Sequence, residues 1–157
     1  MKRNKLDIVR WLLSLFIVLL VLSGITAFKL ESELSWILAQ FDDNSSAFAQ
    51  WLVLAHEGVK YANAHYPFLA YGTDWLAYAH LVIAVVFIGP LIDPVKNIWV
   101  IKFGIIACAG IIPLALIAGQ IRSIPSFWII IDCSFGVLGC VPLIWALILT
   151  NKMIKEK

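Results

Sequence analysis

Four long stretches of this chain are almost free of charged residues, and polar segments separate them. They cover roughly Val9–Phe28, Trp75–Ile92, Ile98–Ile121 and Phe127–Thr150. An α-helix needs about 20 apolar residues to cross a bilayer core of about 30 Å, and it satisfies its backbone hydrogen bonds internally. The pattern therefore predicts four transmembrane helices. The short links Asp93–Asn97 and Arg122–Ser126 make the last three of them antiparallel neighbours.

The segment between the first two predicted spans, Lys29–Gly72, has a helical pattern of its own. Apolar residues recur at helical spacing in two places, first at Leu30, Leu34, Ile37, Leu38 and Phe41, and then at Phe48, Trp51, Leu52, Ala55, Val59 and Ala62. We therefore predict two amphipathic helices at the membrane interface, the second over Ala47–Asn63. Residues 42–46 supply turn and N-cap chemistry between them, and Tyr66 with Pro67 ends the second.

The composition points to lipid as the main solvent of the chain. Of its 157 residues, 62% are hydrophobic and 14% are charged, whereas soluble domains carry about 25% charged residues. The predicted fold is a single all-α transmembrane domain over residues 1–157, a four-helix bundle with two extracytoplasmic interfacial helices. The net charge of +2 is small and the basic residues are scattered, which excludes nucleic acid as a partner.

The distribution of Lys and Arg predicts the orientation in the membrane. With both termini in the cytoplasm, the basic residues outside are Lys29, Lys60 and Arg122, and the rest of the 12 are inside. The first apolar run is too long for a signal peptide and no small-residue cleavage site follows it, so we interpret it as a retained span. The predicted partners are the bilayer and either a second membrane protein or further copies of this chain.

Small residues at four-residue spacing mark the faces on which the last two spans should pack. The pairs are Gly104 with Cys108, Ala115 with Gly119, and Gly136 with Cys140. In lipid, close backbone approach drives helix association. The 3 cysteines all lie in apolar runs, which argues against a disulfide framework or a thiol relay and favours packing.

Three ionisable residues lie in or beside the apolar runs, and they are the first candidates for chemistry. Asp132 must pair, take up a proton or reach water, because an ionised carboxylate in hydrocarbon costs about 3 kcal/mol. We expect it to pair with Arg122; the alternative is a carboxylate in a polar cavity that opens outward. His80 is either a metal ligand, haem ligand or proton relay, or a neutral histidine that donates to a backbone carbonyl.

The remaining candidates are less specific. Asp74 follows Thr73 and is expected to cap the second span. His56 and Glu57 do not form the H-E-x-x-H zinc motif, because Lys60 stands where the second histidine would be. The spacing of His56 and His65 disfavours chelation by that pair alone. Either histidine could complete a metal or haem site with His80; otherwise both lie on a solvated helix face.

Three stretches carry a resemblance to a known group of proteins. They are YPFLAYGTDWLAYAH at Tyr66–His80, GPLIDPVKNIW at Gly89–Trp99, and IDCSFG at Ile131–Gly136. Together they resemble an uncharacterised family of small bacterial inner-membrane proteins. The resemblance implies a bacterial four-span protein of the inner (cytoplasmic) membrane, and it implies no activity or catalytic residue.

Three functions stay open from the sequence. The chain could be a ligand-, metal- or haem-binding module with an extracytoplasmic polar pocket, a proton- or ion-coupled transport component acting as a homo-oligomer, or an accessory subunit. The predicted ligand-binding residues are Glu57, Asp74, His80, Arg122 and Asp132, and the predicted metal ligands are His56, His65 and His80. The sequence contains no glycine-rich phosphate loop and no nucleophile with a base at a useful spacing, so no motif indicates an enzyme.

Overall fold

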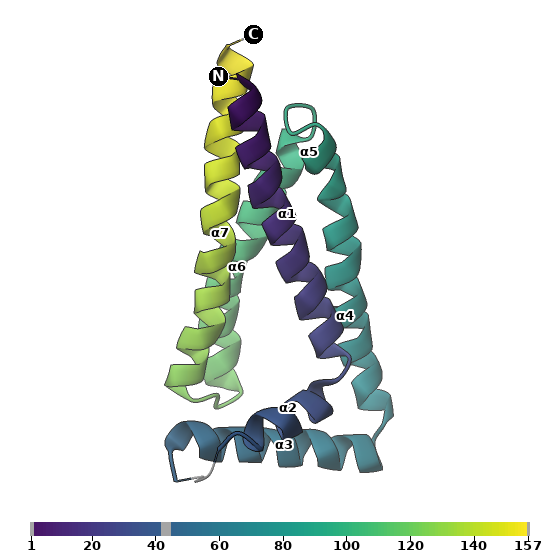
Figure 1. Cartoon of the computed structure of the whole chain (residues 1–157). Coiled ribbons are helices and arrows are strands. Elements are labelled where there is room, and N and C mark those ends of the chain that lie inside the picture. The colour runs from purple at the N-terminus through teal and green to yellow at the C-terminus, as the bar shows by residue number, and fades with distance from the viewer. Residues whose placement is uncertain (1, 42–44, 157) are drawn as a thin grey trace. The chain divides into compact units, whose positions relative to one another are not determined.

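All regular secondary structure of the described residues is helical, as predicted. The computed structural model describes residues 2–41 and 45–156. The elements, labelled in Figure 1, are α1 (Lys2–Ala27), α2 (Leu30–Leu38), α3 (Ala47–His65), α4 (Phe68–Val86), α5 (Ile88–Ile92), α6 (Ile98–Ile121) and α7 (Ser126–Lys155). Residues 42–44 of the predicted turn lie outside the described residues.

Four segments are long and apolar enough to cross a membrane, which confirms the prediction of four spans. They are Asn4–Ala27, Phe68–Ile92, Ile98–Ile121 and Ser126–Lys155. The limits agree with the apolar run for Ile98–Ile121. The first span begins at Asn4 instead of Val9, the second begins at Phe68 instead of Trp75, and the fourth ends at Lys155 instead of Thr150. The short helix α5 continues the second span beyond a break at Phe87, where Pro90 follows and cannot supply a backbone N–H.

The early start of α4 corrects the expected role of Asp74. Tyr66 ends α3, and the N–H groups of Leu69 and Ala70 already bond to the Tyr66 and Pro67 carbonyls at 2.9 and 3.1 Å. Proline at a helix start is favourable because its missing N–H would have no partner there. Asp74 therefore lies inside α4 and does not cap it.

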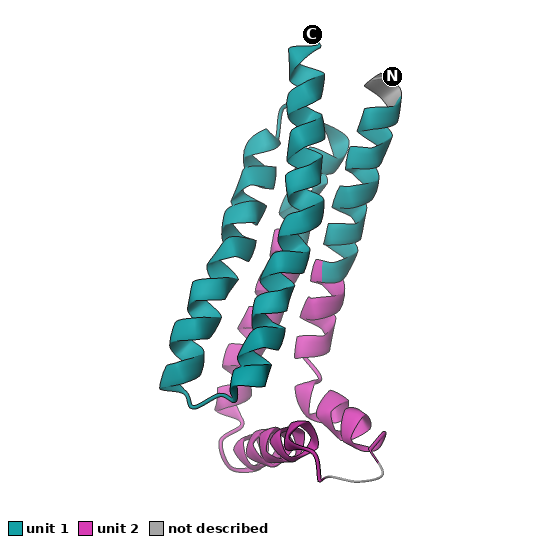
Figure 2. Ribbon diagram, turned by 90° about the vertical axis from the view of Figure 1, so that its left-hand side faces the viewer, with its two compact units in different colours: residues 1–19, 84–157 teal, residues 20–83 magenta. Residues whose placement is uncertain are grey.

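The chain divides into two compact units, coloured separately in Figure 2. Unit 1 comprises Met1–Leu19 and Ala84–Lys157, and unit 2 comprises Leu20–Ile83. The helices α1 and α4 each contribute residues to both units. The prediction of a single membrane domain stays a prediction.

In unit 1, α6 and α7 run antiparallel in close contact, and glycine makes this approach feasible. A Cβ atom at Gly136 would lie 2.6 Å from the backbone oxygen of Cys108. A Cβ atom at Gly104 would lie 2.8 Å from Leu143, and one at Gly119 would lie 2.7 Å from Ile129. The predicted packing of small-residue faces is confirmed at these three glycines.

Backbone hydrogen bonds close the turn between α6 and α7. Ser123 adopts the left-handed conformation with φ 55°. The Ile124 N–H donates to the Gly119 oxygen at 2.9 Å, and the Ser123 N–H donates to the Gln120 oxygen at 3.2 Å. This is the Schellman arrangement that satisfies the last carbonyls of a helix. Pro125 then precedes α7 in extended backbone.

Unit 1 also holds a polar contact between α1 and the end of α5. The Arg10 guanidinium donates from Nε to the Leu91 oxygen and from Nη2 to the Ile92 oxygen, both at 3.2 Å. Carbonyls at a helix end have no intrahelical partner, and a cation there also complements the helix dipole. Arg10 therefore acts as a C-cap supplied from another helix.

We expect Arg10→Gln to lower the free energy of unfolding by about 1 kcal/mol. Charge-assisted hydrogen bonds contribute less to stability when they are exposed to solvent than when they are buried. Far-UV circular dichroism of thermal unfolding in detergent measures the change. The control is Lys102→Gln, an exposed cation of α6 with no polar side-chain contact among the described residues. Equal effects of the two variants would contradict the capping role.

In unit 2, α2 and α3 form an antiparallel helical hairpin that crosses the ends of α1 and α4 (Figure 1). The Ser46 hydroxyl caps α3 by accepting from the Ala49 N–H at 3.1 Å, as the turn chemistry predicted. Leu52 of α3 is buried, and so is Leu34 of α2. Each helix of the hairpin therefore buries an apolar side chain.

Candidate functional site

A cavity in unit 2 has a volume of about 490 Å³. It lies where the end of α1 and the start of α2 meet α3 and α4. Its walls are formed by Ala27, Phe28, Lys29, Leu30, Glu31, Ser32, Val59, Ala62, Asn63, Leu69, Ala70, Thr73 and Asp74. Ligand sites in proteins commonly have volumes of about 300–1,000 Å³, mostly apolar walls and a few placed polar groups. We call this space the unit 2 cavity.

The polar part of the unit 2 cavity carries charges of both signs. Lys29, which is cationic, and the acidic residues Glu31 and Asp74 are among the residues that line it. The Asn63 amide donates to Glu31 Oε2 at 2.7 Å, which holds that carboxylate in place between α2 and α3. Among the described residues, the ion pairs are Lys5 with Glu156 and Lys96 with Asp93, so Lys29 is not neutralised by either carboxylate.

A second, more apolar depression shares two residues with the unit 2 cavity. It has a volume of about 260 Å³ and is lined by Phe28, Tyr71, Asp74, Trp75 and Tyr78. The rings of Tyr71 and Trp75 meet edge to face at 6.0 Å, and those of Trp75 and Tyr78 at 6.4 Å. We call it the aromatic groove, and it continues from the cavity through Phe28 and Asp74.

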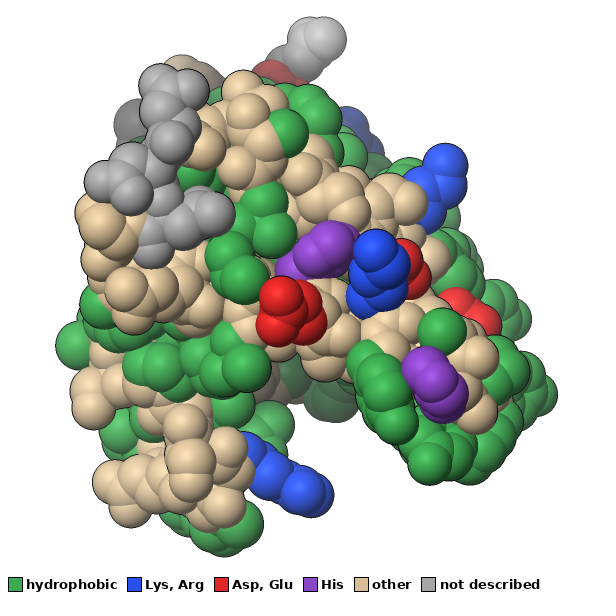
Figure 3. Space-filling view, turned by 90° about the horizontal axis from the view of Figure 1, so that it is seen from below, with side chains coloured by type: hydrophobic (Ala, Val, Ile, Leu, Met, Phe, Trp, Pro, Cys, Tyr) green, Lys and Arg blue, Asp and Glu red, His purple; other side chains and the backbone are tan. Residues whose placement is uncertain are grey.

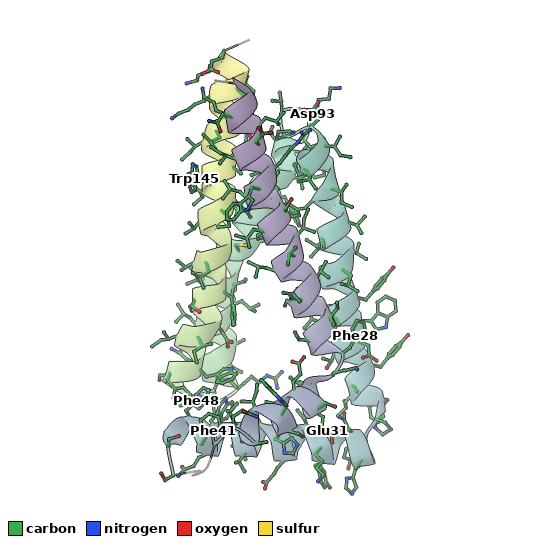
Figure 4. The ribbon with its side chains drawn as sticks, in the orientation of Figure 1. Phe28, Glu31, Phe41, Phe48, Asp93 and Trp145 are labelled. Atoms are coloured by element: carbon green, nitrogen blue, oxygen red, sulfur yellow. The ribbon has the colours of Figure 1, made fainter. Side chains whose placement is uncertain are left out.

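The local sequence explains how these side chains are presented. The chain leaves α1 after Ala27, and α2 begins at Leu30, so Phe28 and Lys29 lie at the corner between two helices. Figure 4 labels Phe28 at the end of α1 and Glu31 in the first turn of α2, on the two sides of this corner. Asp74 and Trp75 lie within α4, where successive residues project in different directions, so one turn of helix lines both spaces.

The two outer histidines have local partners. His56 Nε2 lies 2.8 Å from the Ser35 hydroxyl, a contact that joins α2 and α3. His65 stacks on Tyr61 with ring centroids 4.1 Å apart, and its Nδ1 lies 3.0 Å from the Tyr61 oxygen. Glu57 is exposed and lines neither of the two cavities described. In Figure 3, acidic, basic and histidine side chains lie near one another in the middle of the face seen from below.

His80 lies on the face of α4 that packs against α1. Its Nδ1 lies 2.8 Å from the Leu76 oxygen, and because a carbonyl oxygen only accepts, Nδ1–H is the donor. A Cβ atom at Gly24 would lie 3.2 Å from the His80 Cβ and 2.9 Å from the Ala77 oxygen. A hydrogen bond from the ring to a backbone carbonyl was one alternative that the sequence offered, and His80 makes that bond. His80 lines neither the unit 2 cavity nor the aromatic groove.

The expected ion pair between Arg122 and Asp132 does not form. Both residues belong to unit 1, and the ion pairs of the described residues lie elsewhere. Arg122 is the exposed C-cap of α6, and the Schellman turn that follows separates it from the start of α7. Asp132 is half-buried further along α7. Proximity along a hairpin was therefore insufficient to predict side-chain contact.

No group of three His, Cys, Asp or Glu side chains in the described part of the chain is placed to hold a metal ion. A structural metal site usually needs four protein ligands and a catalytic one three. The metal and haem roles considered for His56, His65 and His80 stay predictions. Of the predicted ligand-binding residues, Asp74 is the one that lines the cavity.

Sequence reasoning missed Lys29, Glu31 and Asn63. All three are polar residues of the outer segment. They are far from Asp74 in the sequence, and their spacing does not predict that they line the same cavity as Asp74. Comparison with known proteins adds no further residue: no family model, no curated protein and no solved structure matches the chain.

Proposed function

We propose that this chain is a membrane-embedded ligand-binding module whose site is the unit 2 cavity. The observation that carries the proposal is the continuity of a charged wall with an aromatic groove, joined by Phe28 and Asp74. A ligand that fits both must be amphipathic, with a polar head and an apolar part. A concave space of this volume, a few fixed polar groups and aromatic walls together are typical of small-molecule sites.

The predicted orientation supports a site at the outer membrane surface. The excess of Lys and Arg near the two termini and in the α5–α6 link favours a cytoplasmic location for those parts. The hairpin of α2 and α3 would then lie outside, as a pair of amphipathic helices in the headgroup layer. The resemblance to small bacterial inner-membrane proteins supports the same location.

Filling the cavity tests this function. We expect Ala62→Trp to remove a bound small molecule, because Ala62 lines the cavity and an indole would occupy much of it. The matched control is Ala64→Trp, an exposed position of the same helix that does not line the cavity. Native mass spectrometry of the protein purified from its own membrane measures the mass carried by each variant.

The native protein and Ala64→Trp should carry an additional small molecule of one defined mass, and Ala62→Trp should not. Circular dichroism and size-exclusion chromatography show whether both variants remain folded and monodisperse. Equal retention by the two variants would exclude the unit 2 cavity as the binding site. A native protein that carries no additional mass would also contradict the proposed binding function.

A further inference from the structure

We propose that the ligand of the unit 2 cavity is a zwitterionic aminophospholipid, whose phosphate faces Lys29 and whose primary ammonium faces Glu31 and Asp74. One acyl chain would lie along the aromatic groove. This inference rests on the proposed ligand-binding function and names its ligand class. It follows from the charge pattern of the cavity, the hydrogen-bonding groups on its wall, and the groove that continues from it.

The charge pattern favours a ligand that carries both signs. Lys29 and the two carboxylates line one cavity without forming an ion pair with each other. A purely anionic ligand would place its charge beside Glu31 and Asp74, and a purely cationic ligand would leave Lys29 uncompensated. A phosphate with an ammonium a few bonds away satisfies both sides, because charge-assisted hydrogen bonds are shorter and stronger than neutral ones.

The wall of the cavity suits a primary ammonium better than a quaternary one. An ammonium has three N–H donors, and the cavity supplies acceptors from Glu31, Asp74 and the hydroxyl groups of Ser32 and Thr73. The Asn63 bond of 2.7 Å already orients Glu31, so little side-chain freedom is lost on binding. A trimethylammonium group has no N–H to donate and would leave these acceptors unsatisfied.

The aromatic groove supplies the apolar surface that an acyl chain needs. Phe28, Trp75 and Tyr78 are all exposed within unit 2, with 46%, 58% and 56% of their surface accessible. Tyrosine and tryptophan are enriched where the headgroup layer meets hydrocarbon, because each has an apolar ring and an O–H or N–H group that can form a hydrogen bond. A lipid bound here would have its head in the cavity and its chain beside α4.

Binding of defined lipids tests the inference. The full chain is placed in nanodiscs of phosphatidylglycerol that contain a minor amount of either phosphatidylethanolamine or phosphatidylcholine. Native mass spectrometry then measures how much of each probe lipid stays on the released protein. Both probes are zwitterionic and carry the same phosphate. They differ in the cationic group, because the ammonium of phosphatidylethanolamine has N–H donors and the trimethylammonium of phosphatidylcholine has none. We expect phosphatidylethanolamine to be retained about tenfold more than phosphatidylcholine.

Variants assign the two ends of the headgroup. The double variant Glu31→Gln with Asp74→Asn should reduce retention of phosphatidylethanolamine to that of phosphatidylcholine. Lys29→Gln should reduce retention of both probes about equally, because both carry the phosphate. The controls Glu33→Gln and Lys60→Gln remove the same kinds of charge at positions that do not line the cavity, and they should retain the native preference.

Three results would overturn the inference. Equal retention of the two probes by the native protein would exclude recognition of the ammonium. Unchanged preference in the double variant would exclude the two carboxylates. Displacement of the lipid by an equal concentration of soluble phosphoethanolamine would identify a soluble phosphoester as the ligand in place of a lipid. In each case, loss of retention in Ala62→Trp but not in Ala64→Trp would leave the cavity as the site, so failure of the headgroup assignment is distinguishable from failure of the proposed function.

Discussion

Replacement of Gly136 by alanine is expected to destabilise the α6–α7 hairpin by about 1 kcal/mol. The added Cβ would lie 2.6 Å from the backbone oxygen of Cys108 and 3.3 Å from the Ile111 Cβ. Backbone cannot rotate away as a side chain can, so the two helices must separate, and overpacking of this kind costs about 1–3 kcal/mol. The better helix propensity of alanine offsets about 1 kcal/mol. Far-UV circular dichroism of thermal unfolding in detergent measures the net change.

Gly110 provides the matched control within α6. A Cβ atom built there meets nothing within 4 Å. Gly110→Ala should therefore keep the gain in helix propensity without the clash and should raise stability by up to about 1 kcal/mol. If both alanine variants shift stability in the same direction, close packing at Gly136 is not what holds the hairpin together.

Replacement of Asp132 by leucine is expected to increase the stability of unit 1 by about 1–2 kcal/mol. One set of buried and half-buried positions on α7 recurs at alternating intervals of three and four residues: Ile129, Asp132, Gly136, Gly139, Leu143, Ala146, Thr150 and Met153. This is the pattern of a helix–helix seam, and Asp132 is its one ionisable member. No hydrogen bond or ion pair of its carboxylate is found among the described residues, so the desolvated group lowers stability.

The register of the hairpin places a small residue of α6 across from Asp132. Gly136 lies against Cys108, and Ile129 lies against Gly119, so Asp132 falls across from the turn of α6 that contains Ala115. Asp132→Asn separates the effect of the charge on stability from the effect of side-chain size, because asparagine is as large as aspartate and does not ionise. Most of the gain should already be present in this variant. A loss of stability in both variants would show that the carboxylate has a stabilising partner.

A carboxylate kept at an unfavourable seam position also bears on the alternative of proton- or ion-coupled transport. Ionisable residues within membrane spans often mark such paths. Comparison of proton flux in liposomes between the native protein and Asp132→Asn separates the two interpretations. A flux that disappears in the variant would assign Asp132 to transport, and the absence of flux in both would leave it as a destabilising residue of the seam.

The membrane helices were predictable because their signal is local. The limits of α6 agree with the predicted span, and the link between α5 and α6 lies at residues 93–97 as expected. In that link the Asp93 side chain accepts from the Val95 and Lys96 N–H groups, both at 3.1 Å (Asp93 is labelled in Figure 4). Short polar turns of this kind depend on neighbours in the chain, which the sequence displays directly.

The start of α4 was less predictable for a related reason. The run from Phe68 to Thr73 contains glycine, tyrosine and threonine, so hydropathy rises only near Trp75. Helix formation follows backbone hydrogen bonding and begins directly after Pro67, before the strongly apolar residues. An apolar window therefore marks the lipid-compatible part of a helix and not its first turn.

The sequence by itself determined that the chain crosses a membrane, how many segments can do so, and which small residues let α6 approach α7. These follow from the length of apolar runs and from side-chain size, and neither depends on distant residues. Only the tertiary structure decided that Lys29, Glu31 and Asp74 line one cavity and that Arg122 does not form an ion pair with Asp132. Those outcomes depend on how the α2–α3 hairpin folds back onto the helices beside it and on how a turn directs a side chain, and no periodicity along the chain encodes either.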